Sequence, residues 1–364
     1  MEKKRNGEID LLRFVFSAII VIHHFTFSYN FSIFKQGYIG VEFFFLLSGY
    51  LMAKSANKLI TQNNKLTSLE IANSSWSFIA KKIKSFYIYY VAAIIIQVIV
   101  KNILMHHDNA ITLVSNFLRS IPTFTLTFMG FNNKSPYLYV GSTWYLSAMI
   151  IAMFILFPLL LRNFEYSSKL IFPALSMFAI GYLYTTNNSI ANWQGWSGIC
   201  FNGILRALGE ISLGASLYVL SNWLRDKYGA KNNKLVKIWF TVIKWFCFAV
   251  VFSFAIGLWS TGAFNLHAYL FCAIGIVISF SGITYCIPES KLSNYLGKIS
   301  LPIYIFHSIV KYYIVEFIKP ESVSLKVFIL MAVFSIIISV ILMYIVDLIK
   351  IVVKIIYKKV SISK

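Results

Sequence analysis

An arginine and a histidine lie eleven residues apart in the apolar stretch LLRFVFSAIIVIHHF, which runs from Leu11 to Phe25. At 100° per residue this spacing closes to within about 20° of whole helical turns, so Arg13 and His24 share one stripe of a helix, about 16 Å apart along its axis. Arginine binds phosphate oxygens through its planar fork of donors, and histidine exchanges protons near neutral pH. The pair therefore fits a long ligand with an anionic head and a distant reactive end, which is the shape of acyl-coenzyme A. His23 points about 100° away from this stripe.

Both residues also have structural interpretations. Arg13 either binds a ligand or extends to the inner lipid headgroups, and His24 either transfers protons or bonds a neighbouring helix. Glu42 follows in the stretch GYIGVEFFFLLSGYLM, at a depth that we expect to match His24. Because a carboxylate beside a histidine orients the ring, we predict that His24 and Glu42 are the catalytic pair; the alternative is a glutamate that faces water. Ser48 and Gly49 in the same stretch are typical of close helix packing.

The composition places these residues in a membrane protein. Of 364 residues, 58% are hydrophobic and 13% are charged, whereas a soluble protein has about a quarter charged residues. Apolar stretches of about 20 residues, long enough to cross a hydrocarbon core of about 30 Å, recur along the chain. The sequence predicts an all-α polytopic membrane protein in which residues 1–364 form one domain. Ten spans are expected near residues 9–28, 38–56, 83–103, 139–161, 169–186, 199–221, 236–258, 266–286, 296–318 and 325–349. The first is interpreted as a retained span because it lacks a small-residue cleavage site.

Basic residues orient these spans, since cytoplasmic loops are enriched in lysine and arginine. The basic cluster 225–237 is expected inside, and the loops 187–198 and 259–265, which lack lysine and arginine, are expected outside. Both termini are then cytoplasmic, with a short basic tail at 350–364. The stretch 111–129 is predicted to be re-entrant or interfacial, because an eleventh span would place the basic cluster outside. The net charge of +20 then reflects topology and attraction to anionic membrane lipid rather than nucleic-acid binding.

Other polar residues inside the predicted spans are candidates for a site. Arg206 with Glu210 one turn later is either a self-neutralised structural pair or a substrate contact. His307 either bonds a helix or contacts substrate, and Trp144 belongs either to the interfacial aromatic belt or to a pocket. The four cysteines lack metal-ligand spacing and are predicted to be small hydrophobic residues, so no metal site is expected.

Four blocks of the sequence resemble the membrane-bound acyltransferase 3 family. Members commonly begin with Asp-x-Leu-Arg, and a histidine follows after ten more residues. The matching blocks here are Asp10 to Arg13 with His24, VEFFFLLSGY (Val41 to Tyr50), TWYLSAM (Thr143 to Met149) and LGKISLPIYIFHSIV with His307. The resemblance extends from about residue 8 to about residue 350, and the four blocks occur in the family's order.

This resemblance implies transfer of an acyl group, usually acetyl from cytoplasmic acetyl-CoA, to a hydroxyl of a cell-envelope glycan. In the family the histidine matched by His24 is regarded as catalytic, and the arginine matched by Arg13 as essential alongside it. Relatives often begin the third span with arginines; here KKIKSFYIYY supplies Lys82 and Lys84, which we expect to bind donor phosphates as point charges. Some relatives carry an extracellular hydrolase-like domain, and this chain resembles the stand-alone members.

Two classes of function remain at this stage. The first is a glycan O-acyltransferase in the plasma or inner membrane of a bacterium, using an acetyl or succinyl donor, with His24 as general base or as the carrier of a covalent acyl group. The second is a translocator of a lipid-linked sugar or another small polar substrate. Transporters often show repeats with broken helices, and the sequence shows no such symmetry, so the enzyme is favoured. The predicted substrate-binding residues are Trp144, Arg206 and His307.

Overall fold

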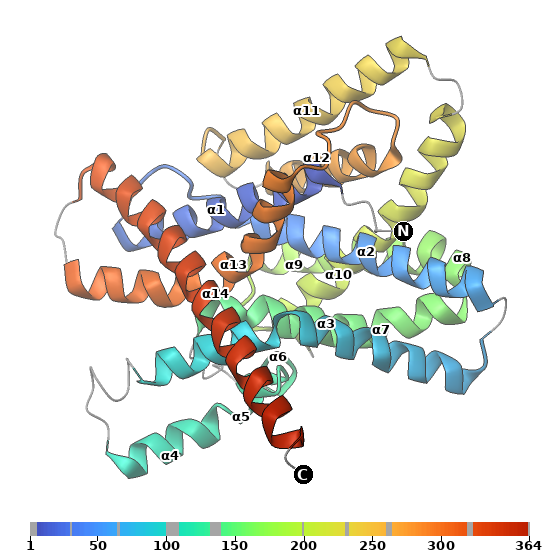
Figure 1. The fold of residues 1–364 in the computed structure, drawn as a ribbon. Helices are drawn as coiled ribbons and strands as arrows, with labels where there is room; N and C mark the ends of the chain where they lie inside the picture. Colours follow the sequence, from blue (N-terminus) through green and yellow to red (C-terminus); the bar gives the residue numbers. More distant parts are fainter. Residues whose placement is uncertain are drawn as a thin grey trace.

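The computed structural model consists almost wholly of α-helices, as the sequence predicts (Figure 1). It describes residues 6–29, 31–63, 66–99, 109–131, 140–198, 200–229, 233–259, 264–318 and 323–362. In these ranges β-structure is limited to one antiparallel pair of two-residue strands, β1 (Trp196–Ser197) and β2 (Cys200–Phe201). The all-α fold class of the sequence analysis is therefore confirmed.

Each of the ten predicted spans coincides with a helix. These helices are α1 (Gly7–Tyr29), α2 (Ile39–Asn63), α3 (Ser68–Gln97), α7 (Trp144–Arg162), α9 (Phe172–Asn187), α10 (Asn202–Leu224), α11 (Lys234–Ile256), α12 (Phe264–Ser281), α13 (Lys291–Ile318) and α14 (Leu325–Ile362). Among the described residues, six helical segments are long and apolar enough to cross a membrane, and these include α1, α2, α7, α10, α11 and α14. The protein is thus a multi-pass membrane protein. The count of ten and the cytoplasmic position of both termini stay predictions.

Shorter elements connect these helices. They are α4 (Ala110–Arg119), α5 (Ile121–Phe124), α6 (Phe128–Phe131), α8 (Phe164–Tyr166), the 3₁₀ turn η2 (Gly141–Thr143) and the π-helical turns η3 (Ser167–Ile171) and η4 (Arg225–Gly229). Parts of three predicted spans, at residues 100–103, 139 and 199, lie outside the described residues.

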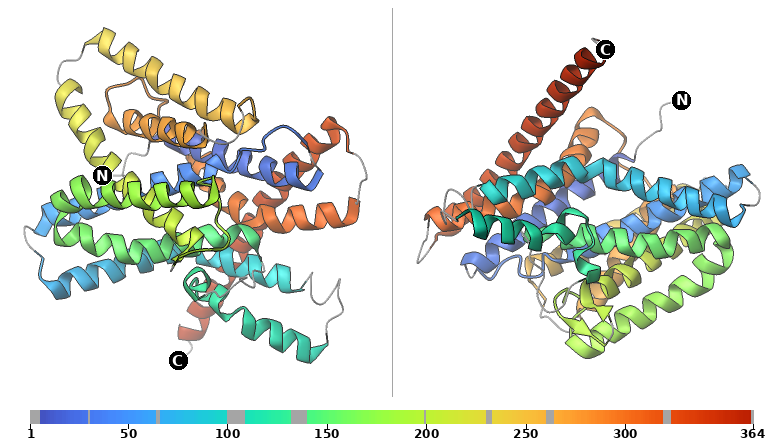
Figure 2. Two further views of the ribbon diagram at one scale, coloured as in Figure 1. Left: turned by 180° about the vertical axis from the view of Figure 1, so that it is seen from behind. Right: turned by 90° about the horizontal axis from the view of Figure 1, so that it is seen from below.

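Two helices extend beyond their predicted spans. α3 begins at Ser68 rather than near residue 83, because Thr67 and Glu70 form a capping box in which the Glu70 carboxylate accepts from the Thr67 amide at 2.8 Å. The lysines at 82 and 84 therefore lie inside a helix and not at its start. α14 continues to Ile362, so the predicted basic tail at 350–364 is helical over nearly all its length. Figure 2 shows this end of α14 projecting beyond the bundle.

The ambiguous stretch 111–129 does not form a spanning helix. α4 has ten residues, which corresponds to a length of about 15 Å, half of a hydrocarbon core. Most of the apolar residues of α4 are exposed, with Ile111 at 82%, and the helix is strongly amphipathic in sequence. The Tyr87 hydroxyl donates to the carbonyl oxygen of Phe124 at 3.1 Å and so ties the following turn to α3. The interfacial interpretation, not the eleventh span, agrees with this geometry.

Small residues allow the central helices to approach closely. α2 packs along α10, and a Cβ atom at Gly49 would lie 2.0 Å from the carbonyl oxygen of Ile211. A Cβ atom at Gly214 of α10 would similarly lie 2.1 Å from the carbonyl oxygen of Leu46. Such mutual contact of backbones is the usual way in which helices associate within a membrane, and it confirms the packing role predicted for Gly49.

Candidate active site

Arg13 and His24 lie on the face of α1 that packs along α13. Arg13 borders a cavity together with Tyr304 of α13, and the His24 ring stacks on the ring of His307 from the same helix. The spacing of eleven residues thus places both side chains toward one neighbouring helix, as the helical period predicts. Their catalytic and donor-binding roles stay predictions.

His23 points in a different direction, toward the start of α2. Its Nδ1 lies 3.0 Å from the carbonyl oxygen of Phe34, and its ring packs edge-on against Tyr38. A Cβ atom at Gly37 would lie only 2.7 Å from the Cβ of His23. His23 is therefore a packing residue at the junction of α1 and α2.

The two stacked histidines form a contact that the sequence did not predict. Their ring centroids are 5.0 Å apart with an interplanar angle of 28°. His307 is fully buried, and its Nδ1 lies 2.7 Å from the carbonyl oxygen of Tyr304. A carbonyl oxygen only accepts, so this Nδ1 carries the proton and donates it, which leaves Nε2 as an acceptor. His307 is thus bonded to its own helix and holds the His24 ring by stacking.

An inner cavity of about 190 Å³ lies between α1, α2, α3, α7 and α13. Arg13 and Lys82 are its cationic lining residues. Ser48 and Tyr145 add hydroxyl groups, which lie 3.1 Å apart. The ring of Tyr304 also lines the cavity, and its centroid is 5.8 Å from that of His307. The cavity therefore has positive charge in its wall and ends one aromatic ring away from the histidine pair.

A wider, open cavity of about 870 Å³ adjoins the inner one. The two share Arg13 and Leu51, so Arg13 lies at their boundary. Lys54 and Glu289 lie among the residues of its wall. We call this wider cavity the vestibule. Lys84 is exposed and lines neither cavity, whereas Lys82 lines the inner one; the donor contacts predicted for both lysines stay predictions.

The arginine at this boundary is held by a neighbour on its own helix. Arg13 Nη1 donates to Asp10 Oδ1 at 3.2 Å. Asp10 itself packs on α13, where a Cβ atom at Gly297 would lie 2.3 Å from its Oδ1. The block from Asp10 to Arg13 thus contacts the block LGKISLPIYIFHSIV directly. Asp10 orients a guanidinium that remains partly exposed.

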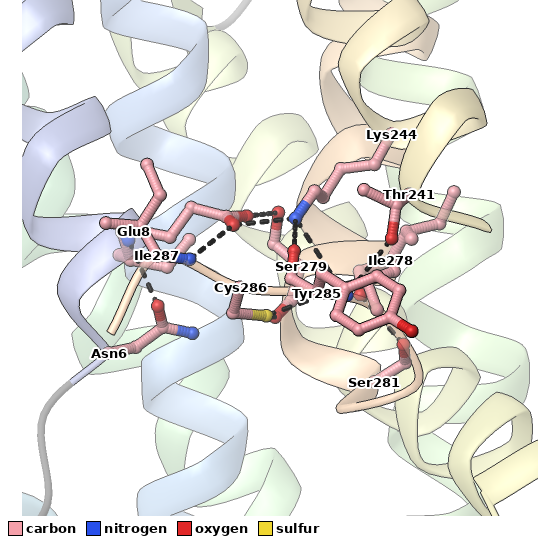
Figure 3. A network of polar contacts seen from close by, with 12 residues as sticks. Asn6, Glu8, Thr241, Lys244, Ile278, Ser279, Ser281, Tyr285, Cys286 and Ile287 are labelled. Carbon is pink, nitrogen blue, oxygen red and sulfur yellow. Dashed lines mark hydrogen bonds and ion pairs between the residues drawn. The ribbon is translucent and has the colours of Figure 1, made fainter. Parts of the chain in front are cut away.

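A buried ion pair anchors the start of α1 beside the vestibule (Figure 3). Lys244 Nζ of α11 donates to Glu8 Oε2 at 2.6 Å, and both side chains are fully buried. Nζ also donates to the carbonyl oxygen of Tyr285 at 3.0 Å, while Glu8 Oε1 accepts from the Ser279 hydroxyl at 2.8 Å. These contacts join α1 to α11 and to the segment after α12. That segment includes Cys286, which was predicted to end the span 266–286. The structure instead places Cys286 after the end of α12, exposed in the wall of the vestibule.

The predicted pair of Glu42 and His24 is not formed, and this is a correction. Glu42 Oε1 accepts from Arg206 Nη2 at 2.7 Å, and Glu42 Oε2 has no hydrogen-bond partner. Arg206 Nε also donates to Glu210 Oε1 at 3.3 Å. The expected pair of Arg206 and Glu210 is therefore present. Glu42 joins it, so that two carboxylates share one guanidinium. Glu42 thus turns toward α10, the helix that packs along α2.

Trp144 belongs to this cluster. The Arg206 guanidinium lies over its ring, 5.1 Å from the centroid, and the ring of Trp193 stacks on it at 5.2 Å with an interplanar angle of 4°. Trp144 is nearly fully buried and lies in the wall of neither cavity, so its substrate contact stays a prediction. Arg206 Nη1 donates to the carbonyl oxygen of Ala191 at 2.6 Å, which ties the α9–α10 loop to the cluster.

Several cavity residues were missed by the sequence analysis. Tyr145 and Tyr304 line the inner cavity, yet a tyrosine in an apolar span is as typical of packing as of binding. Ser48 was assigned to packing and lines the same cavity. All three lie inside the blocks VEFFFLLSGY, TWYLSAM and LGKISLPIYIFH, so their position in those blocks was the available signal.

Comparison with known proteins gives one match. The sequence model of an acyltransferase domain family matches residues 6–347, nearly the whole chain. No curated protein and no solved structure matches the chain significantly. The matched range contains both cavities, the histidine pair and both buried ion-pair clusters.

Proposed function

Since the chain belongs to the membrane-bound acyltransferase 3 family, we propose that it transfers an acetyl group from cytoplasmic acetyl-CoA to a glycan hydroxyl. The acceptor in this proposal is a cell-envelope or extracellular polysaccharide, or its lipid-linked precursor. The membrane is the plasma or inner membrane of a bacterium. Membership of the family itself supports a membrane acyltransferase, and such enzymes generally transfer the acyl group to a hydroxyl.

One observation carries the proposal: a single face of α1 joins a cationic cavity to a histidine. Arg13 and Lys82 lie in the inner cavity, and Tyr304 of that cavity lies beside His307, on which His24 stacks. Coenzyme A carries phosphates at one end and a thioester at the end of a thin arm. The wide vestibule suits the nucleotide, Arg13 and Lys82 suit the phosphates, and the narrower cavity suits the arm, which then points toward His24.

The chemistry assigned to His24 is general-base catalysis. Its ring accepts the proton of the acceptor hydroxyl as the oxygen attacks the thioester carbonyl carbon. The C–S bond then breaks, and the leaving thiolate takes this proton from the imidazolium, so that the products are the ester and the CoA thiol and the ring is neutral again. Alternatively, a ring nitrogen of His24 attacks the thioester carbonyl carbon, and the C–S bond breaks to release the CoA thiolate. The acceptor oxygen then attacks the acetyl carbon, the N–C bond breaks, and the hydroxyl proton passes to the thiolate. In both routes the stacked His307 keeps the His24 ring oriented.

The acceptor is assigned to the cluster around Trp144 and Arg206. This cluster lies beside the α9–α10 loop, which the topology prediction places outside the membrane. Glu42 and Glu210 each retain one buried oxygen without a hydrogen-bond partner, and sugar hydroxyls are donors that satisfy such acceptors. His307 contacts His24 directly, so its predicted acceptor contact becomes a positioning role.

The test is transfer by the purified protein alone. Reconstituted protein is incubated with labelled acetyl-CoA and with envelope polysaccharide isolated from a strain that lacks the gene. Transfer of label to the glycan is expected, and it is expected to be lost in His24→Ala but kept in the matched variant His23→Ala. A translocator of lipid-linked sugar would move its substrate but leave the label on CoA, and that result would contradict the proposal.

A further inference from the structure

The loop between α9 and α10 has an unusual composition for a linker. Residues 187–203 contain asparagine, glutamine, serine and two tryptophans but no Asp, Glu, Lys, Arg or His. Trp196, on strand β1, is 44% exposed, and Gln194 beside it is also exposed. Figure 2 shows the two strands at the margin of the bundle. The surface thus presents an indole and a side-chain amide, and residues 187–203 carry no charged side chain.

Hydrogen bonds and strand pairing join the described residues of this loop to one another. The amide of Asn202 donates to the carbonyl oxygen of Gly195 at 3.0 Å, and the Asn202 side chain donates to the carbonyl oxygen of Gln194 at 2.7 Å. Gly195 has φ +83°, a conformation that glycine adopts without strain. β1 and β2 pair in register through Trp196 and Phe201. A rigid surface of this kind loses little conformational entropy when it binds a ligand.

The loop lies at the same end of the bundle as the histidine pair. The Asn265 side chain donates to the Ser189 hydroxyl at 3.2 Å, and the same side chain accepts from the Tyr38 hydroxyl. The Tyr38 ring in turn packs on His23, the neighbour of His24. On its inner side the loop is continuous with the buried cluster, since Trp193 stacks on Trp144.

We propose that the α9–α10 loop binds an uncharged sugar unit of the acceptor, with Trp196 as the stacking face and Gln194 as a hydrogen-bonding group. This inference rests on the proposed function, because it names the surface that binds the glycan acceptor and states that the bound sugar unit is uncharged. A pyranose ring has an apolar C–H face and a polar rim of hydroxyls. An indole packs against the first, and amide groups bond the second. A uronate or phosphate-bearing unit would find no cation in residues 187–203 to neutralise it.

A lipid-facing tryptophan is the competing interpretation, because tryptophan is enriched at membrane interfaces. Trp259 provides the matched control. It is 41% exposed, follows α11, and lies in the other loop that is predicted to be outside. If both tryptophans are interfacial anchors, replacing either one has a similar effect on acyl transfer. If Trp196 contacts a sugar, only its replacement weakens acceptor binding.

The experiment uses full-length protein in lipid nanodiscs. Acceptor polysaccharide from a strain lacking the gene is fragmented and separated by anion exchange into an uncharged and an acidic fraction. Acetyl transfer and direct calorimetric binding are measured for each fraction with wild type, Trp196→Ala, Gln194→Ala and Trp259→Ala. Trp196→Ala is expected to raise the acceptor KM for the uncharged fraction about tenfold, to leave CoA binding unchanged, and to weaken direct binding in parallel. Gln194→Ala is expected to act in the same direction but less, and Trp259→Ala to match wild type.

Three results would overturn the inference: an unchanged acceptor KM in Trp196→Ala, an equal loss in Trp259→Ala, or binding and transfer confined to the acidic fraction. Failure of the proposed function looks different. In that case wild type transfers label to neither fraction, while the calorimetric arm still reports whether the uncharged fraction binds and whether Trp196 is needed.

Discussion

Replacement of Lys244 by methionine is expected to destabilise the protein by about 3–5 kcal/mol, because it leaves the Glu8 carboxylate buried without its counter-charge. Lys244 and Glu8 are both fully buried, with Nζ 2.6 Å from Oε2. After the substitution, Glu8 keeps the Ser279 hydroxyl at 2.8 Å and the Ile287 amide at 3.4 Å. Two neutral donors replace only part of the hydration that the carboxylate has lost.

The expected loss of stability depends on how deeply the ion pair is buried, and a second ion pair in the chain tests that dependence. Lys169 and Glu165 also form an ion pair, but their side chains are 58% and 67% exposed. Exposed pairs contribute about 0–1 kcal/mol, so Lys169→Met is expected to change stability little. The comparison separates loss of a buried charge partner from the general effect of removing a lysine.

A double-mutant cycle completes the design. Glu8→Gln alone leaves Lys244 unpaired and is expected to be destabilising, whereas Glu8→Gln with Lys244→Met removes both charges and is expected to recover much of the loss. Stability is measured from unfolding in mixed micelles with increasing SDS, followed by tryptophan fluorescence. CoA binding is measured on each folded variant, because the pair anchors the start of α1 beside the vestibule (Figure 3). Stability of Lys244→Met equal to wild type, or additive effects in the double variant, would refute the reasoning.

The remaining predictions concern α1 and the topology. His24→Ala is expected to lower acyl transfer by about 10²–10⁴-fold while the protein inserts and purifies normally, and His23→Ala to be milder; an essential His23 with a dispensable His24 would show that the assignment to His24 is wrong. Arg13→Ala is expected to weaken CoA binding about 10- to 100-fold, since charge-assisted bonds to phosphate contribute roughly 1.5–3 kcal/mol. Arg13→Lys is expected to recover part of this, and unchanged calorimetric affinity in a well-folded Arg13→Ala protein would remove Arg13 from the donor site. A reporter at residue 230 is expected to give a cytoplasmic signal and one at residue 192 an external signal; reversed signals would contradict the ten-span topology.

The sequence by itself determined the helices and which residues share a face of one helix. All ten predicted spans coincide with helices, because the length and hydropathy of a spanning segment are local properties of the chain. The helical period placed Arg13 and His24 on a common face and His23 off it. Helix ends were less predictable: α3 starts early because of one capping box at Thr67.

Only the tertiary structure decided which side chains from different helices meet. Glu42 contacts Arg206 of α10 and not His24, Lys82 lines the cavity while Lys84 does not, and Glu8 pairs with Lys244 across 236 residues of sequence. Each contact depends on how far a helix is rotated about its own axis and how far it is shifted along its neighbour. These two quantities are set by packing, including backbone contact at Gly49 and Gly214, and no periodicity within a single span specifies them.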